Sequence, residues 1–70
     1  MNNLKEIRKA KRMSRLALEK ASGVPARAIK AYESGQVDLM NASYKNIIML
    51  SDALAVEPYE LFMTIQEGNI

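Results

Sequence analysis

Residues 14–35 read SRLALEKASGVPARAIKAYESG and carry the start and stop signals of two short helices. Ser14 is a residue type favoured at helix N-caps, and a helical run from Arg15 to Ala21 follows it. Gly23 tolerates a positive φ better than any other residue, so the first helix is predicted to end there.

The second helix of this stretch is predicted at about residues 25–33. Pro25 suits its first position, because the proline φ is already helical and the missing N–H would be unbonded there. Val24 is expected to fill the angle between the helices, and Gly35 to end the second one. Its inward stripe is predicted to be Ala28, Ile29 and Tyr32.

Two helices joined by a glycine-containing turn of three or four residues form the helix-turn-helix, a DNA-binding unit. Spacing alone also fits any pair of amphipathic helices in a small bundle. The rest of the chain reads as helical too, since it lacks the Val- and Ile-rich alternation of strands. The predicted helices are Leu4 to about Arg12 with a capping box of Asn3 and Glu6, Arg15 to Ala21, about 25–33, one starting at Ala42 or Ser43, and a short one that opens at Glu57 and Pro58 and frays after Gln66.

The fourth of these helices is the most apolar element and is expected to be the spine of the core. The connection before it, residues 36–41, is mostly polar, and at least one of its apolar residues should be buried. The apolar residues of the connection are Val37, Leu39 and Met40, and those of the helix are Tyr44, Ile47, Ile48, Met49, Leu50, Ala53 and Leu54.

From Leu4 to Phe62 the chain resembles the Cro/C1-type (XRE-type) helix-turn-helix family of bacterial and phage regulators. The resemblance implies an all-α, compact five-helix lambda-repressor-like bundle. It would form a single domain over residues 1–70, with a core at about 4–65 and a frayed C-terminal tail. The resemblance rests on Leu18, Ser22-Gly23-Val24, Ile29, Glu33-Ser34-Gly35 and the closing LSDALAV and YELF segments.

Composition narrows the function classes. A chain of 70 residues can build one small core, burying about 60% of the surface of the unfolded chain. It contains no Cys and no His, which excludes a disulfide scaffold, the usual zinc ligands, and Cys/His or Ser/His nucleophilic sites. We therefore expect no catalytic residues, no metal and no cofactor.

No signal peptide or membrane span is visible, so we expect a cytoplasmic protein of bacterial or phage origin, associated with the nucleoid when bound to DNA.

Charge is divided unevenly between the two halves of the chain. Residues 1–35 hold nine Lys and Arg against three Glu, a net charge of +6, whereas residues 36–70 hold one Lys against five acids, a net charge of −4. The basic half contains the helix-turn-helix, as expected of a DNA-binding face. A basic run can also be simply a solvated surface.

In a helix-turn-helix the second helix lies in the major groove, and the first crosses the phosphates. By position, the residues that face the bases are Ala26, Arg27 and Ala31, with Lys30 at the groove edge or beside the backbone. Only Arg27 has hydrogen-bond donors suited to guanine O6 and N7, and the alanines offer contact with a thymine methyl at most. Direct base reading is therefore expected to be sparse.

Phosphate contacts are assigned to Arg15, Ser14, Lys30 and Ser34. Family members commonly carry Gln at the position of Arg15, and Arg keeps that contact while adding charge. The resemblance also places Arg8 and Glu33 where an ion pair ties the first helix to the end of the recognition helix. Three other cations, expected to act at long range or for solubility only, are Lys9, Lys11 and Arg12.

Glu19 departs from the family, which usually has Ala at this position. It must turn outward, either toward the positive N-terminal end of the next helix or toward Arg27 or Lys30. If it neutralises Arg27, base reading is weakened.

Two functional hypotheses follow. The first is a sequence-specific, repressor-like transcriptional regulator that binds double-stranded DNA as a homodimer on an inverted repeat. The second is a protein-interaction module, for example an antitoxin or accessory subunit, that keeps the fold with weak or lost DNA binding. The protein-interaction module would use an apolar patch near the C-terminus. The same patch would also serve as a dimer interface, and some of its residues could instead belong to the core. The patch is Tyr59, Phe62, Met63 and Ile65. An enzyme is disfavoured, because the carboxylates occur singly in a small domain.

Overall fold

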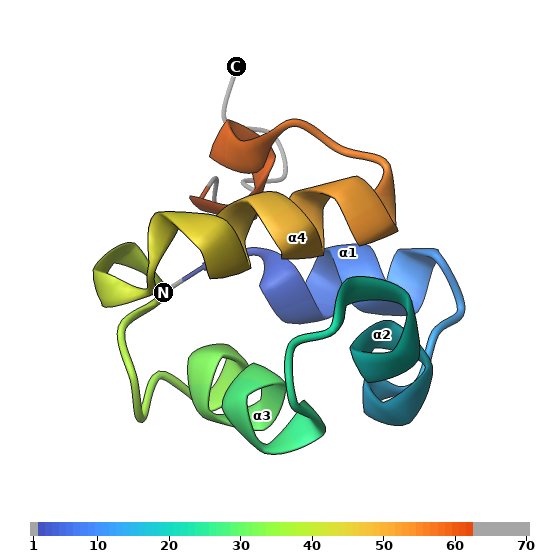
Figure 1. The fold of residues 1–70 in the computed structure, drawn as a ribbon, viewed down its shortest axis with the longest axis horizontal. Helices are drawn as coiled ribbons and strands as arrows, with labels where there is room; N and C mark the ends of the chain where they lie inside the picture. The colour runs from blue at the N-terminus through green and yellow to red at the C-terminus, as the bar shows by residue number, and fades with distance from the viewer. Residues whose placement is uncertain (1, 63–70) are drawn as a thin grey trace, which may run out of the picture.

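The computed structural model describes residues 2–62, which form four α-helices and two short 3-10 helices (Figure 1). The elements in chain order are α1 (Leu4–Ala10), α2 (Arg15–Ser22), α3 (Ala26–Ser34), η1 (Leu39–Asn41), α4 (Tyr44–Leu54) and η2 (Pro58–Phe62). The all-α prediction is confirmed. In Figure 1, α2 and α3 lie below α4, whereas η2 packs on its upper side. None of the helices in residues 2–62 has the length and apolar character needed to cross a membrane.

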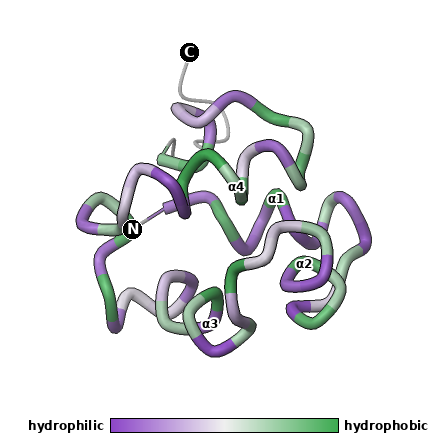
Figure 2. The backbone as a smooth tube through the Cα atoms, in the orientation of Figure 1, coloured by the Kyte–Doolittle hydropathy of each residue, from purple (hydrophilic) through white to green (hydrophobic). Residues whose placement is uncertain are grey.

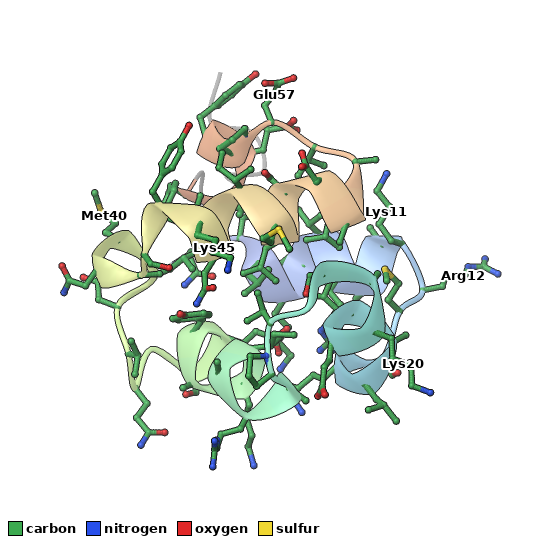
Figure 3. All side chains as sticks on the ribbon, viewed as in Figure 1. Lys11, Arg12, Lys20, Met40, Lys45 and Glu57 are labelled. Atoms are coloured by element: carbon green, nitrogen blue, oxygen red, sulfur yellow. The ribbon has the colours of Figure 1, made fainter. Side chains whose placement is uncertain are left out.

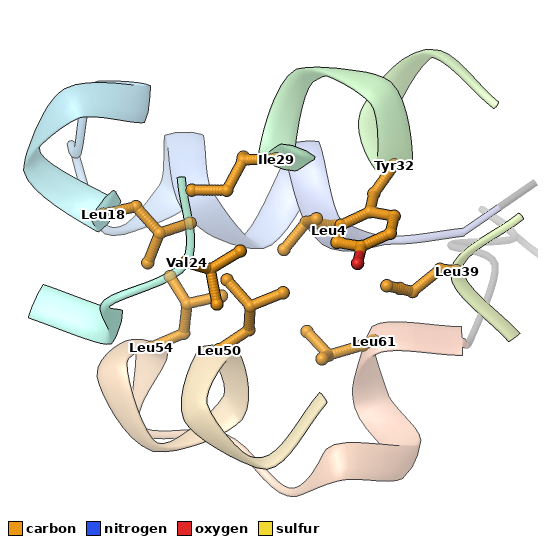
Figure 4. Close-up of a cluster of buried hydrophobic side chains, with 9 residues drawn as sticks. All are labelled: Leu4, Leu18, Val24, Ile29, Tyr32, Leu39, Leu50, Leu54 and Leu61. Atoms are coloured by element: carbon orange, nitrogen blue, oxygen red, sulfur yellow. The ribbon is translucent and has the colours of Figure 1, made fainter. Parts of the chain in front are cut away.

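The core is built from nine side chains that come from every element and from the α2–α3 turn (Figure 4). Hydrophobic and hydrophilic residues alternate along the helices, so each helix has one face to bury (Figure 2). Leu39 is the residue of the 36–41 connection that is buried, as predicted. Tyr44, an apolar residue of the helix predicted to be the spine of the core, is 78% exposed. The nine core residues are Leu4, Leu18, Val24, Ile29, Tyr32, Leu39, Leu50, Leu54 and Leu61.

The predicted last short helix is present in the described residues as a 3-10 helix, Pro58–Phe62, so a fifth α-helix is not shown there. Glu60 N donates to Glu57 O at 2.9 Å, three residues earlier, and Glu57 N donates to the Glu60 carboxylate at 2.8 Å. These bonds close a tight turn, and Pro58 has no N–H to add to it. The predicted core end near Ile65, Met63 of the proposed patch and the tail after Gln66 lie outside the described residues.

The predicted capping box of Asn3 and Glu6 is wrong. The Asn3 side chain makes no cap, and Asn2 Oδ1 accepts the hydrogen bond from Leu4 N at 3.0 Å instead. Asn3 is used elsewhere: its backbone N donates to Leu61 O at 2.8 Å. This bond joins the start of α1 to η2 and so holds the two ends of the described chain together.

Helices α2, α3 and α4 each end at a residue in the left-handed conformation. Gly23 and Gly35, with φ of 83° and 82°, end α2 and α3 as predicted. Ala55 ends α4 with φ of 58°, a conformation that is strained for a residue with a Cβ atom. Arg12 also has a positive φ of 59°, and α1 ends at Ala10, two residues earlier than predicted.

α2 ends at a left-handed glycine and α4 at a left-handed alanine, and this difference leads to a paired prediction. Ala55→Gly should raise the free energy of unfolding by about 1 kcal/mol, because it removes the Cβ strain, and Gly23→Ala should lower it by a similar amount. A Cβ on Gly23 would lie 3.7 Å from Met49 Cε, an ordinary contact, so this variant reports backbone strain and not a clash. Urea unfolding of both variants measures the changes, and a loss of stability in Ala55→Gly would contradict the assignment.

Candidate nucleic-acid interface

The start of α2 is fixed by its cap. Ser14 Oγ accepts a hydrogen bond from Ala17 N at 3.0 Å, which confirms the predicted N-cap. Leu18 N donates to Ser14 O at 3.0 Å and closes the first turn. Ser14 is exposed, and its hydroxyl proton remains available for an outside acceptor. Arg15, the first residue of the helix, is therefore held at a defined place on the surface.

The turn between α2 and α3 is fixed from inside. Ser22 Oγ donates to Leu18 O at 2.7 Å and accepts from Val24 N at 3.1 Å, so one buried hydroxyl joins the last turn of α2 to the chain beyond it. Gly23 N donates to Glu19 O at 2.7 Å. Val24 is 2% exposed and fills the angle between the helices, as predicted. These contacts set the orientation of α3 relative to α2.

Glu19 caps α3. The helix begins at Ala26, so Pro25 is not its first residue as predicted but precedes it, with an extended ψ of 142°. Pro25 has no side-chain acceptor, and Glu19 Oε1 accepts from Ala26 N at 2.8 Å instead. The carboxylate thus satisfies a free N–H at the positive end of α3. Among residues 2–62 it forms no ion pair with Arg27.

The predicted base-facing residues share one outer face of α3. Arg27 and Lys30 are exposed and lie three residues apart, while Ala26 and Ala31 are half-buried. Neither cation forms an ion pair within the described part of the chain. In Figure 3, side chains on the lower side of α3 that end in nitrogen point away from the protein. The structure therefore leaves this face uncovered and its charges unneutralised by direct pairing.

A buried carboxylate joins three helices beside this face. Glu33 Oε2 lies 2.6 Å from Arg8 Nε, and Glu33 Oε1 lies 3.0 Å from Arg15 Nε. The Glu33 side chain is only 1% exposed, the Arg8 side chain 9% and the Arg15 side chain 38%. Arg8 also donates from Nη2 to Glu33 Oε1 at 3.2 Å and from Nη1 to Met13 O at 2.7 Å. The structure thus brings Arg8 and Glu33 together, and it adds Arg15 to the pair.

The remaining predicted phosphate contact is Ser34, which is exposed. Ser34 Oγ donates to Ala31 O at 3.2 Å, so a phosphate would have to replace this internal acceptor. Lys11 and Arg12 lie at the far end of α1, and Lys20 lies on the outer side of α2 (Figure 3). These three cations surround the α1–α2 end of the domain and do not join the face of α3.

The sequence analysis missed one feature of this interface and left a second one open. It assigned Arg15 to a phosphate alone, and nothing in helical periodicity connects Arg15 with Glu33, which lies 18 positions later. It left three directions open for Glu19, and the structure selects the N-terminus of α3. One signal for the second feature was available in the sequence. Pro25, which precedes α3, cannot cap it as Asp, Ser or Thr would, and Glu19 lies shortly before it.

The buried ion pair leads to a stability prediction. Arg8→Met should lower the free energy of unfolding by about 3 kcal/mol or more, because it leaves a buried Glu33 carboxylate with one partner only. Arg12→Met is the matched control: Arg12 is exposed, and its replacement should change stability by less than about 0.5 kcal/mol. Urea unfolding of both variants measures the difference, and equal losses would show that the pair does not stabilise the fold.

The comparisons with known proteins agree with this geometry. A family model described as Helix-turn-helix (HTH_3) matches residues 4–61, a region that includes all four α-helices. No curated protein and no solved structure matches the chain. The family match covers most of the chain and includes the turn, the recognition helix and the buried ion pair. The chain therefore belongs to the Cro/C1-type helix-turn-helix family, in which this fold is a DNA-binding domain.

Proposed function

We propose that this protein is a sequence-specific, repressor-like transcriptional regulator that binds double-stranded DNA with α3 in the major groove. The observation that carries the proposal is the uncovered face of α3, where Arg27 and Lys30 are exposed and have no ion-pair partner in residues 2–62. Arg15, at the start of α2, lies where the first helix of the motif crosses the phosphate backbone. The net charge of +6 in residues 1–35 supports attraction to DNA.

Base reading in this proposal depends on one side chain. Arg27 can donate two hydrogen bonds to O6 and N7 of a guanine, the commonest specific contact in the major groove. Ala26 and Ala31 are half-buried and offer only methyl groups. Glu19 does not weaken this contact by direct pairing, because its carboxylate is used at Ala26 N. Sequence preference should therefore be strongest at a guanine in each half-site.

One domain of this size makes few contacts, so the proposal includes a homodimer on an inverted repeat. Half-site centres one helical turn apart are separated by about 34 Å. Each domain measures 35 × 25 × 19 Å, so two of them can sit side by side at that separation. Tyr59, which is 64% exposed on η2, is a candidate for the dimer interface. Such a protein would act in the cytoplasm, on the nucleoid.

Salt dependence is the direct test. A dimer that contacts six to ten phosphates should lose about 10³ to 10⁵ in affinity for its tightest genomic fragment between 50 and 200 mM salt. Binding of genomic fragments, followed by fluorescence anisotropy, should identify a tight subset with this steep slope. Weak binding of equal strength to every fragment would reject the regulator and favour the protein-interaction module.

Two alanine variants should separate base from backbone contacts. Arg27→Ala should cost about 1 to 3 kcal/mol in binding and flatten the sequence preference. Arg15→Ala should weaken binding to all sequences alike and make the salt slope shallower by about one.

A duplex with a modified base tests directly whether Arg27 reads the guanine. Replacing the preferred guanine by 7-deazaguanine removes the N7 acceptor, so it should weaken binding of the unmodified protein and leave Arg27→Ala unchanged. If both proteins lose affinity equally on the modified duplex, Arg27 does not read that base.

A further inference from the structure

The two arginines that share Glu33 use it differently. Arg8 directs Nε and both Nη groups to protein acceptors, namely the Glu33 carboxylate and Met13 O. Arg15 donates through Nε alone, at 3.0 Å to Glu33 Oε1, and its Nη groups have no acceptor in residues 2–62. The Arg15 side chain is 38% exposed, whereas the other two are almost completely buried. One edge of the Arg15 guanidinium is thus fixed and the other faces outward.

The charges of the three side chains also indicate that the outer edge of the Arg15 guanidinium is available to a partner. Glu33 with Arg8 alone is a neutral, buried pair, and Arg15 brings the cluster to a net charge of +1. Because Arg8 already balances the carboxylate, the charge of Arg15 is not cancelled by the residue that holds it. The excess charge lies at the exposed member of the cluster, at the first residue of α2. A guanidinium held on one edge and free on the other is suited to bind a phosphate through its free edge.

We propose that Glu33 is a positioning residue for phosphate binding: it holds the Nε edge of Arg15, so that the Nη edge meets a DNA phosphate. This inference rests on the proposed DNA binding. Glu33 belongs to the last turn of the recognition helix, so the same carboxylate fixes the distance between the phosphate contact and the base-reading face. The side chain is ordered before DNA arrives, which reduces the conformational entropy lost on binding.

Arginine is required for this role, and lysine does not replace it. A lysine ammonium is a single charged group at the end of a flexible chain, so it can pair with Glu33 or with a phosphate but lacks two separate donor edges. Arg15→Lys keeps the charge and should still lose affinity. A simple electrostatic contact would tolerate the same change.

The test is a double-mutant cycle on the full chain. The probe is the tightest duplex recovered from a random pool of double-stranded oligonucleotides. Arg15→Lys should weaken binding roughly tenfold in the wild-type background and less than about threefold when Glu33→Gln is also present. The matched control is Arg12→Lys, the same chemical change at an exposed site away from α3, which should change affinity by less than about twofold in both backgrounds.

Equal losses from Arg15→Lys in the two backgrounds would overturn the positioning role while leaving DNA binding intact. Absence of any tight duplex for the unmodified protein would instead reject the proposed function on which it rests.

Glu33→Gln removes a buried charge and can unfold the domain, so a second measurement uses the unmodified sequence. In ¹⁵N-labelled protein, the Arg15 Nε–Hε resonance, assigned by its absence in Arg15→Lys, should be protected from exchange without DNA and stay at the same shift when DNA is added. The Arg15 Nη resonances should shift on DNA addition. Movement of the Nε–Hε signal to the position of a solvent-exposed arginine on binding would show that Arg15 leaves Glu33 to reach DNA, and would overturn the proposal.

Discussion

The buried carboxylate of Glu33 is the constraint on which the arrangement of this domain depends. It comes from the last turn of α3 and is 1% exposed, so its charge has to be compensated inside the protein. Arg8 of α1 and Arg15 of α2 supply that compensation. Three helices are therefore tied at one point, close to the surface proposed to meet DNA. A change in the angle between α2 and α3 would break at least one of these bonds.

The other fixed point is the turn between α2 and α3, where local sequence predicted the end of α2 and the buried Val24 but not the first residue of α3. Ser14, Gly23 and Gly35 act through their own backbone surroundings, so their roles as cap and helix ends follow from residue type alone. Val24 is the one large apolar residue in a small, polar turn, and its burial follows from that contrast. Local chemistry of this kind is what made the helix-turn-helix predictable.

The features that the sequence analysis missed or left open depend on contacts between distant positions. The side chain of Glu19 caps a helix seven residues later, and Asn3 joins α1 to η2 across the whole domain, so neither pairing leaves a periodic trace. A short last helix was predicted at Pro58, but helical propensity alone does not show whether such a segment is a 3-10 helix or an α-helix. The candidate site was predictable as a surface, through the spacing of Arg27 and Lys30, and the resemblance also implied the Arg8–Glu33 pair beneath it. The contact of Arg15 with Glu33 was not predictable in this way.

The proposed function requires that the chain binds DNA through the α2–α3 face. The most direct measurement is the set of backbone amide chemical shifts of ¹⁵N-labelled protein during titration with the tightest-binding duplex. The shifts should concentrate in the first turn of α2 and in residues 26–31, with small changes in η2. Shifts confined to η2 around Tyr59, with α3 unaffected, would contradict it and would place the binding surface on the opposite side of α4.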